Sequence, residues 1–253
     1  MTGPFLIPRL SYDLGTFKPG LYFFDNEYLD KFSIIGSFSV NSKKDLDVVL
    51  LFDYNEMKSS YFFNLYWVTR HISKIHPYYD DATNTQSNTI NWHIDYIYEL
   101  FSADMGSRII IKDHKFWLKY TYSKYRQYIY PTKIQTYEFN GENTIQESFK
   151  YAHDFFRGHA VSLDYKYDGR KREFMQNMLP KNGFKVYASI SYEKNNIFEG
   201  FKANDDYGGF IEDLKSHDLI RYKIDLSNYW KINSDLISFI SFENNLKYYV
   251  LSN

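Results

Sequence analysis

The chain has 253 residues, of which 21% are aromatic and 24% charged, and its formal net charge is −1. This charge balance gives no support for a nucleic-acid partner, and the absence of cysteine excludes disulfide bonds and thiolate metal sites. No apolar run approaches the ~18 residues of a membrane-spanning helix, and the start of the chain, Met1–Pro4, does not open a basic and then apolar signal peptide.

Aromatic rings are abundant, with 26 Tyr, 22 Phe and 4 Trp, although only 44% of the residues are hydrophobic. This combination is typical of a membrane β-barrel that has aromatic girdles and a polar interior. A soluble carbohydrate-binding β-sandwich, which would stack sugars on its tyrosines, is the alternative.

Alternation of apolar and polar residues predicts strands along the first third of the chain. They cover residues 5–13, 20–26, 32–40, 46–54 and 61–73. Gly15 and Pro19 predict a turn between the first two strands, and Lys58–Ser60 predicts a tight turn before the fifth. Pro8 requires an edge strand or a strand end, because proline has no N–H to donate to a ladder.

The middle of the chain mixes long strands with polar segments. Residues 90–111 predict one long strand or a bulged pair, with Gly106 as the bulge, and residues 116–128 predict the next strand after a turn at 112–115. The polar segments 74–89 and 129–157 are predicted as long loops, the second of which contains a short hairpin.

The strictest alternation lies between His159 and Glu193 and predicts an antiparallel hairpin. The apolar positions are Val161, Leu163, Tyr165 and Tyr167 in the first arm and Phe184, Val186, Ala188, Ile190 and Tyr192 in the second. In a barrel this face contacts lipid and the polar face lines the lumen. The charged residues expected to line the lumen are Asp164, Lys166, Lys185, Glu193, Arg221, Lys223 and Asp225.

A third polar segment, 195–218, is predicted as a loop, and strands follow at 220–227 and 236–246. The prediction is thus about eleven strands and no helix, joined as an antiparallel up-and-down barrel. The three long loops fall at one end of this sheet and the short turns at 27–31, 58–60, 112–115 and 231–235 at the other, as in outer-membrane barrels. The connection at 169–183 is long on the short-turn side and departs from this rule.

Three stretches resemble the BamA/TamA-type bacterial surface antigens, which are outer-membrane assembly factors. Pro180-Lys181-Asn182-Gly183 resembles the Pro-x-x-Gly element that opens a late barrel strand in that family, and residues 227–242 resemble the turn that follows. Residues 4–54 resemble the barrel start in the subset whose barrel follows a TolB-like propeller. The family's Arg-Gly-Phe motif is absent.

The resemblance implies that residues 1–253 form one transmembrane barrel segment of the bacterial outer membrane, truncated before the final strands, with about eleven of sixteen strands present. It implies a role in outer-membrane protein assembly or polypeptide translocation, and the lipid bilayer, client polypeptides and periplasmic domains of the same longer chain as partners. A pore or receptor barrel of another family is a further alternative.

No catalytic, cofactor-binding or metal-binding residue is predicted, and we expect a protein that is not an enzyme. His71 and His76 near Asp80 and Asp81 lack the spacing of a known metal site. His159 and Ser162 point to opposite faces of a strand, as do His153 and Asp154, so neither pair forms a catalytic dyad.

Two surface features remain as hypotheses. The basic run Arg170-Lys171-Arg172 is a solvated turn or a contact for anionic headgroups. Tyrosines and a tryptophan that are predicted to end strands favour an aromatic girdle over ordinary strand propensity. They are Tyr125, Tyr128, Tyr130, Tyr165, Tyr167, Tyr229 and Trp230.

Overall fold

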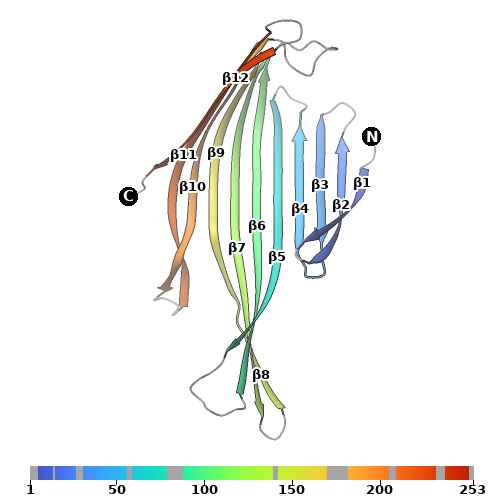
Figure 1. The fold of residues 1–253 in the computed structure, drawn as a ribbon, viewed down its shortest axis with the longest axis vertical. Coiled ribbons are helices and arrows are strands. Elements are labelled where there is room, and N and C mark those ends of the chain that lie inside the picture. Colours follow the sequence, from blue (N-terminus) through green and yellow to red (C-terminus); the bar gives the residue numbers. More distant parts are fainter. Residues whose placement is uncertain are drawn as a thin grey trace.

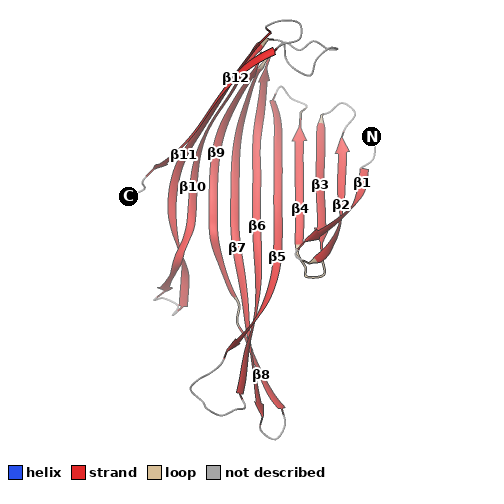
Figure 2. Cartoon of the chain, viewed as in Figure 1, coloured by secondary structure: helices blue, strands red, loops and turns tan. Residues whose placement is uncertain are grey.

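The computed structural model describes residues 5–13, 15–26, 31–55, 59–78, 88–138, 142–169, 182–204, 209–231 and 237–250. In these residues the chain forms twelve strands and no helix (Figure 2). The described part of the chain therefore contains no helix long and apolar enough to cross a membrane.

The strands follow one another along the chain as a single sheet (Figure 1). The first six are β1 (Phe5–Asp13), β2 (Thr16–Asn26), β3 (Phe32–Val40), β4 (Leu46–Tyr54), β5 (Ser59–Tyr78) and β6 (Asn88–Ile111). The other six are β7 (His114–Glu138), β8 (Glu142–Ser148), β9 (Tyr151–Asp168), β10 (Gly183–Asn204), β11 (Gly209–Lys231) and β12 (Ile237–Val250).

Every strand pairs antiparallel with its neighbour in sequence, except that β8 pairs only with β7 and β9 takes the next place beside β7. The predicted up-and-down meander is confirmed, and β8 is the strand that the count of eleven missed. The described strands form one layer, whereas a β-sandwich would need two. β1 and β12 lie at opposite edges and do not pair with each other, so the sheet is open, as expected.

Two of the three predicted long loops are wrong over most of their length, and the first, 74–89, is wrong at both ends, while residues 79–87 lie outside the described residues. Residues 74–78 and 88–89 belong to β5 and β6, most of 129–157 belongs to β7, β8 and β9, and most of 195–218 belongs to β10 and β11. In these segments apolar and polar residues do not alternate strictly, so the sequence lacks the two-residue signal of a strand. Cross-strand backbone hydrogen bonds form regardless of that polarity. The long connections were predicted at one end of the sheet. At that end the strands themselves are extended, and these extensions project at the lower end of Figure 1.

Two prolines lie inside the N-terminal hairpin. Pro8 is in the edge strand β1, as predicted. Pro19 was predicted in a turn but lies in β2, opposite Leu10. It is tolerated there because the pairing of β2 with β3 begins only at Gly20, so no ladder bond is lost on that side.

The two faces of the sheet differ in polarity. Residues directly opposite each other on neighbouring strands point to the same side, so the apolar sets of successive strands gather on one face and the polar sets on the other. Among the described residues, the only buried hydrophobic side chain is Leu219. The buried polar residues are Lys18, Ser37, Ser39, Asn41, Asp45, Asp47, Gln127, His153, Asp154 and Ser162. Large apolar side chains such as Val161, Leu163 and Ile190 are instead exposed. This pattern is the reverse of a soluble domain.

Ion pairs on the polar face show that this face is concave. Lys18 of β2 is 0% exposed, and its Nζ lies 3.1 Å from Oδ2 of Asp47 on β4. Arg70 of β5 also pairs with Asp47, and its Nε lies 2.9 Å from Oδ2 of Asp13 on β1. Side chains four strands apart in the sheet meet in this way only on the inside of a curl.

Gly106 is not a bulge. The register of β6 with both β5 and β7 continues through it without a shift. Glycine is needed there for close packing, because a Cβ would lie 2.3 Å from the carbonyl oxygen of Leu118 and 2.6 Å from the Phe62 ring. The register shifts that the sheet does contain lie beside β7, at 125/126, and in β10, at 198/200.

We expect Gly106→Ala to lower the free energy of unfolding by about 1–3 kcal/mol, because the neighbouring backbone cannot move away from the added methyl group. Gly200→Ala is the matched control, since a Cβ there meets nothing within 4 Å. Urea unfolding in detergent micelles, followed by tryptophan fluorescence, measures both. Equal effects of the two substitutions would contradict the close-packing explanation.

Candidate functional site: a polar trough on the concave face

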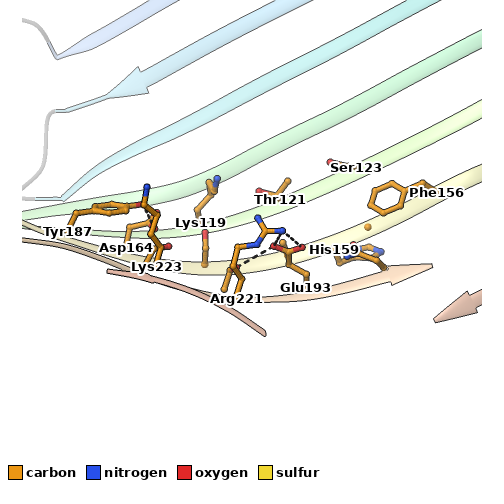
Figure 3. Close-up of a pocket in the computed structure, with 16 residues that line it drawn as sticks. Lys119, Thr121, Ser123, Phe156, His159, Asp164, Tyr187, Glu193, Arg221 and Lys223 are labelled. Carbon is orange, nitrogen blue, oxygen red and sulfur yellow. Dashed lines mark hydrogen bonds and ion pairs between the residues drawn. The ribbon is translucent and has the colours of Figure 1, made fainter. Parts of the chain in front are cut away.

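A polar trough runs along the concave face where β7, β9, β10 and β11 lie side by side (Figure 3). Every second residue of each strand points into it. Ser191, for example, lies opposite both Ser162 of β9 and Arg221 of β11. The trough encloses about 480 Å³, and a second hollow of about 390 Å³ continues it past Lys166 and Lys185.

All seven charged residues predicted to line the lumen share this face. Ser189 lies opposite Asp164 and Lys223, and Tyr187 lies opposite Lys166 and Asp225. The other three, Lys185, Glu193 and Arg221, follow in the same alternation. Their common face is therefore confirmed, while contact with a water-filled lumen remains a prediction.

Several of these charges are paired within the trough. Arg221 lies 3.2 Å from Glu193 (Figure 3). Lys223 lies 3.2 Å from Asp225 and 2.9 Å from Glu243 of β12. The Tyr187 hydroxyl donates a hydrogen bond of 3.1 Å to Asp164. All of these contacts cross strands except the one between Lys223 and Asp225, which both lie on β11, and they fix the positions of their side chains.

Other groups in the trough have no partner among the described residues. The buried Oγ of Ser162 and the Nε of Arg221 make no hydrogen bond. Lys119, Lys166 and Lys185 form no ion pair within the described part of the chain. Five cationic side chains thus line the two hollows against three acidic ones: Lys119, Lys166, Lys185, Arg221 and Lys223 against Asp164, Glu193 and Asp225. The trough can hold a polar ligand, and its charge favours an anionic one.

Aromatic residues gather toward both ends of the apolar face. Toward the short-turn end, the His114 ring lies 4.9 Å from that of Tyr167 and 5.9 Å from that of Tyr165. Toward the other end, the His159 ring lies 5.0 Å from that of Tyr122. Trp67 donates a hydrogen bond of 2.9 Å to Glu99.

The predicted girdle residues divide into two groups. Tyr165 and Tyr167 lie close to the end of β9, and Tyr229 and Trp230 close to the end of β11, as predicted. The other three, Tyr125, Tyr128 and Tyr130, lie inside β7, which continues to Glu138. The prediction of a strand end there is wrong, because the residues after Tyr130 continue the strand without strict alternation.

Beyond the apolar stretch of β9 lies a second charged cluster around Asp154, which is 0% exposed. Arg126 and Arg157 each donate a hydrogen bond from Nε to its carboxylate, and Lys124 lies 3.8 Å away. Burial acts to raise the pKa of Asp154, but the hydrogen bonds from the two arginines and the nearby positive charges outweigh it and hold the pKa below its usual value.

The remaining candidates from the sequence do not form sites in the described residues. The His71 side chain contacts Asp45 at 2.9 Å, while Asp80, Asp81 and the side chain of His76 lie outside the described residues. The His159 Nδ1 lies 2.7 Å from the hydroxyl of Tyr120 rather than near Ser162. No group of three potential metal ligands occurs in the described part of the chain.

Two further predictions cannot be placed. Arg170-Lys171-Arg172 and the first two residues of Pro180–Gly183 lie outside the described residues. His153 and Asp154 do not pair, as predicted. His153 lies among aromatic rings, and Asp154 lies among cations. The clusters around Asp47 and Asp154 were missed, because their members come from strands far apart in sequence.

No protein-family model, curated protein or solved structure matches this chain in the comparisons made.

We expect Asp154→Asn to lower the free energy of unfolding at neutral pH by about 2 kcal/mol, because the half-buried cations around it lose the buried anion that they share. The pKa of Asp154 is depressed in the folded state, so its contribution is present above the unfolded value of about 3.9 and is lost as the pH falls through the folded value. Acidification should therefore destabilise the parent chain more than the variant.

Urea unfolding at pH 7 and pH 3 in detergent measures both effects. Asp213→Asn is the control, since Asp213 forms an exposed pair with Lys202 and should change stability by less than about 1 kcal/mol. Equal losses for the two variants at pH 7 would show that the Asp154 cluster contributes no more than a surface pair.

Proposed function

We propose that this sheet forms part of the wall of a β-barrel in the bacterial outer membrane, with its apolar face toward lipid and its polar trough toward the lumen. The inverted burial pattern carries this proposal. Polar side chains such as Lys18 and Ser162 are buried on the concave face, while large apolar side chains cover the convex face and stay exposed. Lipid contact is the environment in which such an exposed apolar face is stable.

The length of the apolar face supports the same conclusion. A tilted strand needs about 9–11 residues to cross a bilayer. In β10 the apolar alternation runs from Phe184 to Tyr192, and the next residue on that face is Lys194. In β9 it runs from Tyr167 back to Val161, and Arg157 lies beyond. Charges are thus kept out of the stretch in which Arg or Lys would cost roughly 2–4 kcal/mol.

A narrower proposal follows from the resemblance to surface antigens, in which this barrel assists outer-membrane protein assembly or polypeptide translocation. The trough, lined by hydroxyls and by charges of both signs, would contact the backbone and polar side chains of a passing polypeptide.

Spin labels test the orientation of the sheet, and the chain has no native cysteine to interfere. We expect labels that replace Lys185 and Lys223 to be accessible to a water-soluble nickel reagent in lipid vesicles. Labels at the adjacent Val186 and Ile224 should be accessible to oxygen dissolved in the lipid instead. The reversed result would show that the polar face contacts lipid and would contradict the proposed orientation. Nickel access at all four positions would show that both faces contact water and would contradict the membrane proposal.

A reconstitution assay tests the narrower role. Lipid vesicles that contain the full chain should accelerate the insertion of an unfolded outer-membrane barrel protein relative to empty vesicles. Vesicles that contain an unrelated barrel control for simple bilayer disturbance. The same insertion rate in all three preparations would contradict the proposed role in assembly but would not bear on the proposal that the sheet forms a barrel wall.

A further inference from the structure

The sheet forks below the apolar face, between β9 and the β10–β11 arm (Figure 1). Pairing of β9 with β10 ends at Phe156 opposite Ile197. Beyond this point residues 151–155 of β9 stay beside β7, and residues 198–204 of β10 pair with β11. The fork thus has two prongs, one formed by β7 and β9 and the other by β10 and β11. Their strand edges face each other but share no ladder of backbone hydrogen bonds.

Aromatic rings connect the two prongs in place of backbone hydrogen bonds. The His153 ring of β9 lies 5.1 Å from the ring of Phe198 and 5.5 Å from that of Phe201 on β10, and Phe155 lies 5.9 Å from Phe198. His153 is only 5% exposed, and its Nδ1 makes no hydrogen bond. A buried polar atom without a partner is uncommon, and this one belongs to a residue that lines the fork.

A cavity of about 930 Å³ opens in the fork. Its wall is largely apolar, from Ile129, Ala152, Phe201, Ile211 and Leu214, and His153 contributes its imidazole. A cavity of this size accepts one large apolar side chain together with the backbone on either side of it.

The edge of β9 in the fork is capped by a side chain. The Asp154 N–H donates a hydrogen bond of 2.8 Å to the Glu212 carboxylate of β11. Glu212 thus occupies the place of the strand carbonyl that a neighbouring backbone would supply. Arg157 lies 3.3 Å from Glu212 and also pairs with Asp154. With Lys124 and Arg126 included, three cations face two carboxylates.

We propose that the fork is a binding site for an extended peptide segment, which adds a strand to the β9 edge at 151–155 and places a bulky apolar side chain in the cavity. The free edge requires a backbone partner, which an extended peptide supplies and a lipid does not. An acidic side chain in the peptide would match the excess of positive charge and would replace Glu212 beside Arg157. This site lies outside the trough and does not depend on the proposed function.

The test uses the full chain in detergent micelles and a fluorescent hexapeptide of sequence Thr-Val-Phe-Val-Glu-Thr. The control peptide carries proline in place of both valines and cannot complete a ladder. We expect the first peptide to bind at least about tenfold more tightly, as measured by fluorescence anisotropy. Glu212→Ala should tighten its binding by about tenfold, because the peptide no longer displaces a hydrogen bond to a charged group.

Ala152→Trp fills the cavity and should abolish binding. Amide hydrogen exchange on the parent chain serves as a measurement that needs no variant. Saturation with the peptide should slow exchange at 151–155 and leave the strands of the trough unchanged. Equal affinity for the two peptides, weaker binding to Glu212→Ala, or protection confined to the trough would each overturn the proposal.

Discussion

A single layer of strands has no interior, so the whole structure depends on the two-residue period that sends successive side chains to opposite faces. Continuous antiparallel register carries this period across the sheet, from Phe5 opposite Phe24 to Asp218 opposite Val250. A slip of one residue at any pairing would carry charges of that strand to the apolar face. Cross-strand ion pairs, such as Lys223 with Glu243 and Arg221 with Glu193, therefore help to define the register as well as to stabilise it.

Curvature adds a second constraint. The charges around Asp47 come from β1, β2, β4 and β5, and they meet only when the N-terminal strands curl inward. Lys18 is fully buried there, so loss of its partner would leave a desolvated charge. This cluster acts at one end of the sheet in the same way as the Asp154 cluster acts near the fork. In both, a central carboxylate gathers cations, which come from other strands except for Arg157, a residue of the same strand as Asp154.

Much of this fold could be predicted from alternation alone. The hairpin at 159–194 and the common face of its charged residues required only the two-residue period. The turn predicted at 112–115 required only local chemistry, and the structure narrows it to Lys112-Asp113. The strand extensions could not be predicted in this way, because their apolar and polar residues do not alternate strictly. The close approach of Leu118 and Phe62 to Gly106 could not be predicted either, since they meet it only through the pairing of separate strands. The site at the fork depends on where the pairing of β9 with β10 stops, and no local pattern marks that point.

The length of β7 has a mechanical consequence. Its 25 residues, at ~3.3 Å each, extend roughly 80 Å, whereas the apolar band of a barrel is about 25 Å tall. Even at a tilt of ~45°, the strand rises well clear of such a band. The register of β5, β6 and β7 with one another is unbroken, which makes this projection a stiff extension of the sheet, whereas register shifts lie beside β9 and in β10, close to the point where the two prongs separate. In the proposed orientation, the fork therefore lies beyond the headgroups, on strands that continue directly from those in the bilayer.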